Sequence, residues 1–337
     1  EDTVRALRML GGKPTIDPLA ELPPLAPGEA LVRIRRASLT SVEALAGLSA
    51  ADGRTLGHEA VGVVERIEHN GRPDWKQLEN ARVAIHPVVS CAACALCRAG
   101  LAWHCAARRV IGLSTPQGAL ADRLVVPARN LIPIPNTLDD DKACLAVTVG
   151  AAIQLTHAVR VEGKTFVTVL GDGPIGLLAA QILARKNASV RLLGRHPDRF
   201  SLCERWGIKH RHESEAGRRA DQTIVLDCTG SPAGLGLAAR LVRPRGTVVV
   251  KGPPTGFTRD GVWPADLMTL IDREVAILPC SSTNLREGLD AIASHAVDLD
   301  PFLGRRLRLE QAPDALALLR QRAILRAIVD FERPNAA

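Results

Sequence analysis

The sequence is poor in aromatic side chains, and this scarcity excludes one class of function. Of the 337 residues only 3% are Phe, Trp or Tyr, and tyrosine is absent altogether. Proteins that bind single-stranded nucleic acid stack the bases on aromatic rings interleaved with basic residues. The net charge of +7 therefore does not predict a nucleic-acid partner, and we interpret it as serving an anionic cofactor.

Long apolar runs are also lacking. No stretch approaches the roughly 20 apolar residues that span a bilayer, and the opening EDTVRALRML has no apolar signal region. With 46% hydrophobic residues over 337 positions, the chain can bury the cores of two domains. We therefore expect a cytoplasmic, globular protein with no membrane partner.

The cysteines are unevenly distributed, and half of the eight stand between residues 91 and 105. The four are Cys91, Cys94, Cys97 and Cys105. Four thiolates converging from one loop make a closed tetrahedral site that suits Zn²⁺ and leaves no position for substrate. An iron–sulfur run would place its fourth cysteine sooner, and disulfides are not expected without a secretory signature. The spacing predicts structural zinc, and the alternative is a lobe that has lost its metal.

Two patterns of secondary structure divide the chain. Residues 1–150 contain short strand-like runs, such as 60–66, between close turn signals, which predicts a compact β-barrel-like unit. Strands and helices alternate over 151–281, which predicts a parallel sheet covered on both faces. The remaining stretch, 282–337, is expected to complete the first domain. The predicted fold class is therefore α/β.

A glycine-rich turn begins the second region. The sequence GDGPIG follows the strand-like run 165–170 and opens a helical pattern, which is the context that a dinucleotide-binding turn requires. In such a turn the glycines allow a tight bend, close approach of the pyrophosphate, and contact between helix and strand. The predicted cofactor-binding residues of this turn are Gly171, Gly173, Pro174, Ile175 and Gly176.

The end of the next predicted strand bears on the choice of cofactor. NAD sites carry an acid there to bind the ribose 2′-hydroxyl, but this chain has Gly194, followed by Arg195 and, nearby, Arg199. Glycine leaves room for a 2′-phosphate, and arginine offers it a charge-assisted pair of hydrogen bonds. The sequence favours NADP(H) over NAD(H); the alternative is that Arg195 is a solvated surface charge.

Several motifs in order resemble those of the medium-chain, zinc-type alcohol dehydrogenase superfamily. They are PGEALV (27–32), GHEAVGVV (57–64), the four-cysteine lobe, GALAD (118–122), the GDGPIG turn, and DCTGS (227–231), which contains Thr229. The resemblance covers essentially the whole chain. It implies a GroES-like catalytic domain and a Rossmann domain with the active site between them, hydride transfer between nicotinamide and a carbonyl or alcohol carbon, and a homodimer or homotetramer.

The chain departs from this family at the catalytic zinc. Thr40 stands where zinc-type members have their first cysteine ligand, and Glu43 replaces a neighbouring aspartate. His58, the second ligand, is present, whereas Thr148, or Gly150 in another register, stands at the third. A neutral hydroxyl is a poor zinc ligand, and a catalytic zinc wants three strong ones.

Three hypotheses follow for the catalytic site. In the first, the catalytic zinc is lost, as in the quinone and enoyl reductases of the superfamily, and Thr40, His58 and Glu59 serve the reduction of a carbonyl or an activated C=C. In the second, His58 and Glu59 hold zinc with a displaced ligand such as Cys144 or His157. In the third, the chain binds dinucleotide without turnover. We favour the first, with a small-molecule substrate and NADP(H).

Overall fold

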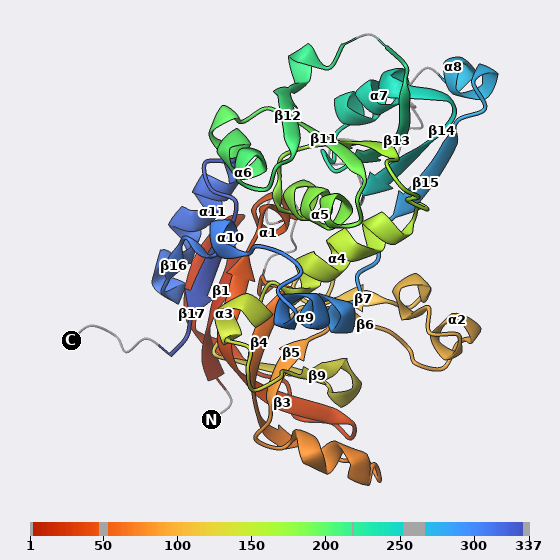
Figure 1. The fold of residues 1–337 in the computed structure, drawn as a ribbon. Coiled ribbons are helices and arrows are strands. Elements are labelled where there is room, and N and C mark those ends of the chain that lie inside the picture. Colours follow the sequence, from red (N-terminus) through yellow and green to blue (C-terminus); the bar gives the residue numbers. More distant parts are fainter. Residues whose placement is uncertain (1–2, 47–52, 218, 252–266, 333–337) are drawn as a thin grey trace. The chain divides into compact units, whose positions relative to one another are not determined.

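The polypeptide folds into two units, each built on its own β-sheet (Figure 1). The computed structural model describes residues 3–46, 53–217, 219–251 and 267–332. The first unit comprises residues 1–147 and 299–337, and the second comprises 148–298. The sequence placed the second boundary at 281. It lies later because helix α9 (Leu285–Ala293) belongs to the second unit, where Gln154 donates a hydrogen bond to Glu287 at 3.0 Å.

The first unit is rich in strands. Its strands are β1 (Thr3–Leu10), β2 (Lys13–Glu21), β3 (Glu29–Leu39), β4 (Ala60–Ile67), β5 (Arg82–Ile85), β6 (Val88–Val89), β7 (Arg109–Val110), β8 (Arg123–Pro127), β9 (Leu131–Pro133), β16 (Arg306–Leu307) and β17 (Ala327–Asp330). Its helices are α1 (Ser41–Ala46), α2 (Ala95–Arg98), α3 (Asp140–Ala143), α10 (Asp300–Leu303) and α11 (Ala312–Arg320). Helix α4 (Ala146–His157) spans the boundary with the second unit.

Strand β3 is the centre of the main sheet of this unit. The order is β16-β17-β3-β4-β5-β9, and β8 also pairs with β3. Alternate residues of β3 are buried, and Val32 and Ile34 are at most 1% exposed, because one face of the strand packs on the core. The C-terminal strand β17 runs antiparallel to β3, with Ile328 opposite Ser38. The end of the chain thus completes the first unit.

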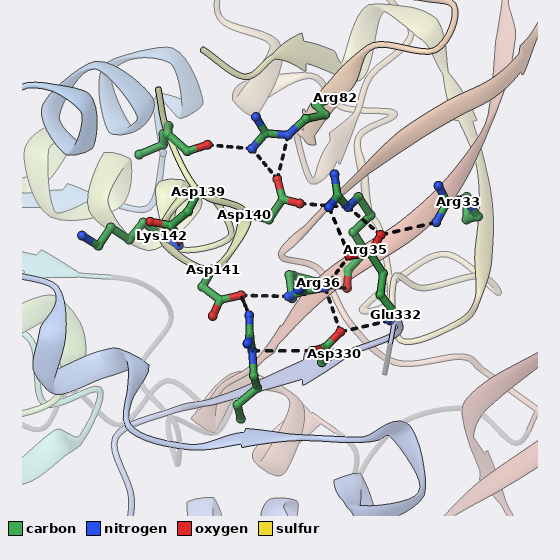
Figure 2. Close-up of polar contacts among 12 residues, drawn as sticks. Arg33, Arg35, Arg36, Arg82, Asp139, Asp140, Asp141, Lys142, Asp330 and Glu332 are labelled. Carbon is green, nitrogen blue, oxygen red and sulfur yellow. Dashed lines mark hydrogen bonds and ion pairs between the residues drawn. The ribbon is translucent and has the colours of Figure 1, made fainter. Parts of the chain in front are cut away.

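An ion-pair network fastens this C-terminal return (Figure 2). Arg36 of β3 contacts Asp141 of α3 and Asp330 of β17, each at 2.8 Å. The side chains of Arg36 and Asp330 are only 10% and 4% exposed. Arg82 of β5 contacts Asp140 of α3 at 2.6 Å. Because breaking a buried ion pair leaves an uncompensated charge, this network holds β3, β5, α3 and β17 together.

The second unit is a parallel sheet with helices. Its strands are β10 (Phe166–Leu170), β11 (Ser189–Gly194), β12 (Lys209–His212), β13 (Gln222–Asp227), β14 (Val242–Lys251) and β15 (Ala276–Cys280). Its further helices are α5 (Pro174–Arg185), α6 (Phe200–Arg205), α7 (Pro232–Leu241) and α8 (Leu267–Asp272). The order β12-β11-β10-β13-β14-β15 is that of a Rossmann sheet, in which all strands are parallel and the strand order reverses between β10 and β13. The α/β fold class expected from the sequence is confirmed.

Candidate functional site

The four cysteines of residues 91–105 converge in the first unit. Their sulfur atoms all lie within 4.8 Å of one another. The Cys94 N–H donates to Cys91 Sγ at 3.4 Å, and the Cys97 N–H donates to Cys94 Sγ at 3.5 Å. Backbone hydrogen bonds, chiefly from Ala93 and Cys94, lower the pKa of Cys91 to about 6. A set of four thiols so arranged fits a tetrahedral metal ion.

A second polar cluster lies where β3 leads into α1. The Thr40 hydroxyl donates to Glu43 Oε2 at 2.6 Å, and the Thr40 N–H donates to the same oxygen at 3.0 Å. Thr40 Oγ1 accepts from the Val42 N–H at 3.0 Å. The other oxygen of Glu43 faces His58 Nδ1 in a short contact. Thr40 therefore caps the turn before α1, and its single hydroxyl proton is given to Glu43.

The carboxylate of Glu59 lies on the other side of His58 and is held by an arginine. Glu59 Oε1 lies 3.7 Å from His58 Nε2, and Glu59 Oε2 accepts a short hydrogen bond from Arg326. The same guanidinium nitrogen donates to Ser38 Oγ at 2.6 Å. Glu59, Arg326 and Ser38 are all at most 3% exposed. The cluster thus joins β3 and the segments just before β4 and β17.

The electrostatics of the cluster favour a charged His58 beside a charged Glu43. Burial would raise the pKa of Glu43, but the charge of His58 and hydrogen bonds from His58 and Thr40 outweigh it and lower that pKa. Burial would likewise lower the pKa of His58, but the Glu43 carboxylate, its hydrogen bond and the charge of Glu59 raise it. In this part of the chain, as the structure describes it, His58 Nε2 makes no hydrogen bond.

The structure shows what the candidate zinc ligands of this cluster contact. The hydroxyl of Thr40 and both oxygens of Glu43 are engaged by protein groups, and Glu59 is paired with Arg326. Within the described ranges, the cysteine lobe is the one group of three or more His, Cys, Asp or Glu side chains close enough to share an ion. The donor set around His58 therefore does not fit a catalytic zinc.

The third-ligand positions offer no replacement. Thr148 of α4 is buried, with 5% of its surface exposed. A Cβ built on Gly150 would lie 2.2 Å from the backbone oxygen of Asn284, so only glycine fits there. Both residues serve the packing of α4.

The displaced ligands that the second hypothesis invoked are also engaged elsewhere. Cys144 is buried, and its thiol donates to the backbone oxygen of Glu59 at 3.7 Å. Burial raises its pKa well above the ordinary value, which disfavours the thiolate that a metal requires. His157 is half-exposed, and its Nδ1 lies 3.8 Å from Glu287 Oε2.

The glycine-rich turn has the geometry that its sequence predicts. Gly171 has φ +101°, in the left-handed region, as a tight bend between β10 and α5 requires. A Cβ on Gly176 would lie 2.0 Å from the backbone oxygen of Gly171, whereas a Cβ on Gly173 would meet nothing within 4 Å. Gly173 caps α5, and Pro174 and Ile175 form its first turn. The turn is therefore tightly packed at Gly176, whereas there is open space beside Gly173.

The predicted ribose-binding residues lie at the end of β11. Gly194 is the last residue of β11, and a Cβ there would lie 2.4 Å from Asp172 Oδ2. The Arg195 side chain is 56% exposed and contacts Glu213 at 2.6 Å. Arg199 is buried beside Asp172. Thr229 is used locally, since its N–H and hydroxyl both donate to Asp227 Oδ1.

Three residues of these sites are not among those predicted from the sequence. Ser38 and Arg326 complete the His58 cluster, and Asp172 lies in the glycine-rich turn but was not one of its predicted cofactor-binding residues. Arg326 is 267 positions from Glu59, so no local pattern points to it. Asp172 did give a signal, because an acid inside a phosphate-binding turn is chemically out of place.

No helix in the described part of the chain has the length and apolarity needed to cross a bilayer.

Residues 26–136 match the family described as "Alcohol dehydrogenase GroES-like domain". This match covers most of the first unit and includes the strands from β3 to β9 together with the cysteine lobe.

The chain is also similar to known proteins over larger spans. It is 26% identical over 208 residues to an L-threonine 3-dehydrogenase of Rhizobium rhizogenes, an alignment that covers 59% of each chain. It is 24% identical over 277 residues to a zinc-type alcohol dehydrogenase-like protein of Haemophilus influenzae, with 78% of each covered. A crystal structure of a Sinorhizobium meliloti 1021 protein bound to NADP superposes with a TM-score of 0.84 at 24% identity, covering 98% of this chain and 100% of that one.

Proposed function

Because the chain belongs to the medium-chain dehydrogenase/reductase superfamily, we propose that it is an NADP(H)-preferring oxidoreductase that works without a catalytic zinc. The observation that carries this proposal is the arrangement around His58. Its Nδ1 is held by Glu43, while its Nε2 makes no hydrogen bond among the described residues. A histidine whose Nδ1 is held by one carboxylate, and whose Nε2 makes no hydrogen bond but lies beside a second carboxylate, is suited to proton transfer.

The second unit has the features of a dinucleotide site. The bend at Gly171, the open space before Gly173 and the beginning of α5 would hold the pyrophosphate, and Arg195 would meet the 2′-phosphate. The relative from Sinorhizobium meliloti was crystallised with NADP, which supports this choice. When bound, NADP(H) supplies or accepts the hydride.

His58 is the residue to which we assign the proton. In reduction the substrate oxygen takes up negative charge as its carbon receives hydride, and the imidazolium of His58 donates the Nε2 proton to it. Glu43 keeps the imidazole protonated at Nδ1, and Glu59 adds to the stabilisation of the charged ring. Thr40 orients Glu43 through its hydroxyl. Because no metal stabilises an alkoxide, we assign the physiological direction to reduction of a carbonyl or activated C=C.

The zinc of this protein is structural in our proposal. It would be held by the four cysteines Cys91, Cys94, Cys97 and Cys105. A zinc ion enclosed by four thiolates stabilises the lobe and takes no part in the reaction. Zinc-type relatives such as the Haemophilus influenzae protein support the metal. A site built of reduced thiols also suits the cytoplasm.

We further propose a small-molecule substrate and self-association as a homodimer or homotetramer, with no nucleic-acid partner. Strand β15 is the edge of the second sheet, and Met268 and Ile271 of α8 are 62% and 57% exposed. Exposed apolar groups near a strand that is the edge of the sheet among the described strands are suited to contact with a second copy. Light scattering after gel filtration would test this, and a monomer would refute it.

Metal analysis combined with turnover tests the proposed function. We expect one zinc per chain, the same content in His58→Gln, and oxidation of NADPH by members of a panel of aldehydes, ketones and enones. Two zinc ions per chain, one of them lost in His58→Gln, would establish a zinc-dependent alcohol dehydrogenase instead. Nucleotide binding without turnover of any compound would establish the non-catalytic alternative.

A further inference from the structure

Asp172, within the glycine-rich turn, fills the place where dinucleotide sites carry an acid on the next strand. The strand-borne acid projects from the end of the second strand toward the ribose, and here that position is Gly194. A Cβ on Gly194 would lie 2.4 Å from Asp172 Oδ2 and 2.7 Å from Asp172 Cβ. The side-chain space of residue 194 is therefore occupied by the carboxylate of residue 172.

The carboxylate of Asp172 also binds the backbone that follows β11. Its Oδ2 accepts hydrogen bonds from the Arg195 N–H at 2.9 Å and the His196 N–H at 2.8 Å. Its Oδ1 contacts His196 Nδ1 at 2.8 Å. Hydrogen bonds to an ionised acceptor are about twice as strong as neutral ones. Asp172, which is only 4% exposed, thereby fixes the direction in which the chain leaves the strand.

The negative charge of Asp172 is compensated within the protein. Arg199 Nη1 donates to the Asp172 backbone oxygen at 3.1 Å and lies 3.6 Å from Oδ1. Arg199 is 7% exposed, so this pair is largely shielded from solvent and is screened little by salt. A compensated carboxylate repels an incoming phosphate far less than an unpaired one.

Arg195, in contrast, presents its charge at the surface. Its Nε donates to Glu213 Oε1 at 2.6 Å, and its side chain is 56% exposed. Exposed pairs of this kind contribute little stability, so the guanidinium can exchange Glu213 for a doubly charged phosphate. The side-chain pair with Glu213 does not fix the Arg195 backbone. The backbone is held by the hydrogen bond from the Arg195 N–H to Asp172.

We propose that Asp172 is a positioning residue that determines cofactor choice. It excludes an acid at position 194 by occupying that space, and it holds Arg195 where a 2′-phosphate would be bound. The inference rests on the proposed dinucleotide binding and deepens it by naming the residue that makes the protein prefer NADP(H) to NAD(H).

The first experiment compares nucleotide affinities by fluorescence titration with NADPH and NADH. In Asp172→Ala the dissociation constant for NADPH should rise about ten-fold or more, the equivalent of one strong charged hydrogen bond, while that for NADH changes little. Asp198→Ala is the matched control, because Asp198 is exposed, lies in the same segment, and its side chain makes no contact in the described structure. It should leave both constants unchanged.

The second experiment moves the acid back to the strand. Gly194→Asp alone should abolish binding of both nucleotides, because two carboxylates would share one space. The double variant D172A/G194D should bind NADH again and discriminate against NADPH. Asp172→Val, which removes both acceptor oxygens but keeps a branched side chain, serves if Asp172→Ala does not fold.

The outcomes separate this inference from the proposed function. If the wild-type protein binds neither nucleotide, the proposed function fails and the inference fails with it. If the wild-type protein binds but Asp172→Ala or Asp172→Val leaves the NADPH/NADH ratio unchanged, the inference alone is refuted. Normal binding by Gly194→Asp would likewise refute it, since position 194 would then have room.

Discussion

Two clusters of the first unit contain residue types that bind zinc, and among the described residues only the cysteine lobe brings three or more such side chains close enough to share an ion. In the cysteine lobe four sulfurs lie within 4.8 Å of one another and face one another. Around His58 the carboxylates and the hydroxyl are already bound to protein partners, Glu43 to Thr40 and His58, and Glu59 to Arg326. The comparison teaches that a metal site needs uncommitted donors that converge, and that suitable residue types alone do not make one.

The two clusters also differ in how they are assembled. The lobe comes from one stretch of chain, residues 91–105, and its geometry is set by short-range turns. The His58 cluster draws on β3, α1 and the segments just before β4 and β17. The first should therefore respond to metal removal, and the second to loss of a hydrogen-bond or charge partner.

The largest effect is expected from breaking the lobe. Cys97→Ser should reduce the zinc content from one ion per chain to nearly none and lower the melting temperature, because the binding free energy of a structural zinc is also folding free energy. Zinc content and thermal unfolding measure both effects. Cys203→Ser, which removes a buried thiol of the second unit, should keep its zinc. A Cys97→Ser protein that retained its zinc would show that the lobe is not the metal site.

The next effect in size concerns the buried pair of Glu59 and Arg326. Arg326→Met should destabilise the fold by about 3–5 kcal/mol, because Glu59 would be left buried without its partner. Chemical denaturation measures this, and Glu59→Gln combined with Arg326→Met should recover much of the loss. Arg286→Met, at an exposed position with no ion pair in the described structure, is the control. Equal stability of the Arg286 and Arg326 variants would contradict the arrangement.

The same contrast explains what the sequence could predict. The cysteine spacing and the GDGPIG turn are local patterns, and the structure gives the geometry that each requires. The parallel sheet was predicted from alternating strands and helices, but the sequence KHRH of β12 lacks apolar residues and gives no strand signal of its own. The partners Arg326 and Asp172 could not be placed, because long-range contacts and the direction of a side chain depend on tertiary packing. For the same reason the sequence placed the end of the second unit at 281, whereas in the structure this unit ends at 298.

Removing the imidazole tests the chemical role of the second cluster. His58→Gln should lower kcat for carbonyl or enone reduction by about 10²–10⁴-fold, the usual contribution of general acid catalysis, with zinc content and NADPH affinity unchanged. His69→Gln is a close control, because His69 also contacts a glutamate, Glu79, at 2.8 Å in the same unit. Full activity in His58→Gln would show that His58 is not the proton donor.

The smallest effect, and the most specific, is a shift along the pH axis. Burial lowers the pKa of His58, but Glu43 outweighs it and the pKa is raised, so the imidazolium persists to higher pH than in a free histidine. The reductive rate should fall as pH rises through that pKa, because the proton donor is lost. In Glu43→Gln the raising charge is gone, so this alkaline limb should move to lower pH while zinc content stays the same. Glu79→Gln should leave the profile in place; if Glu43→Gln does so too, Glu43 does not govern His58.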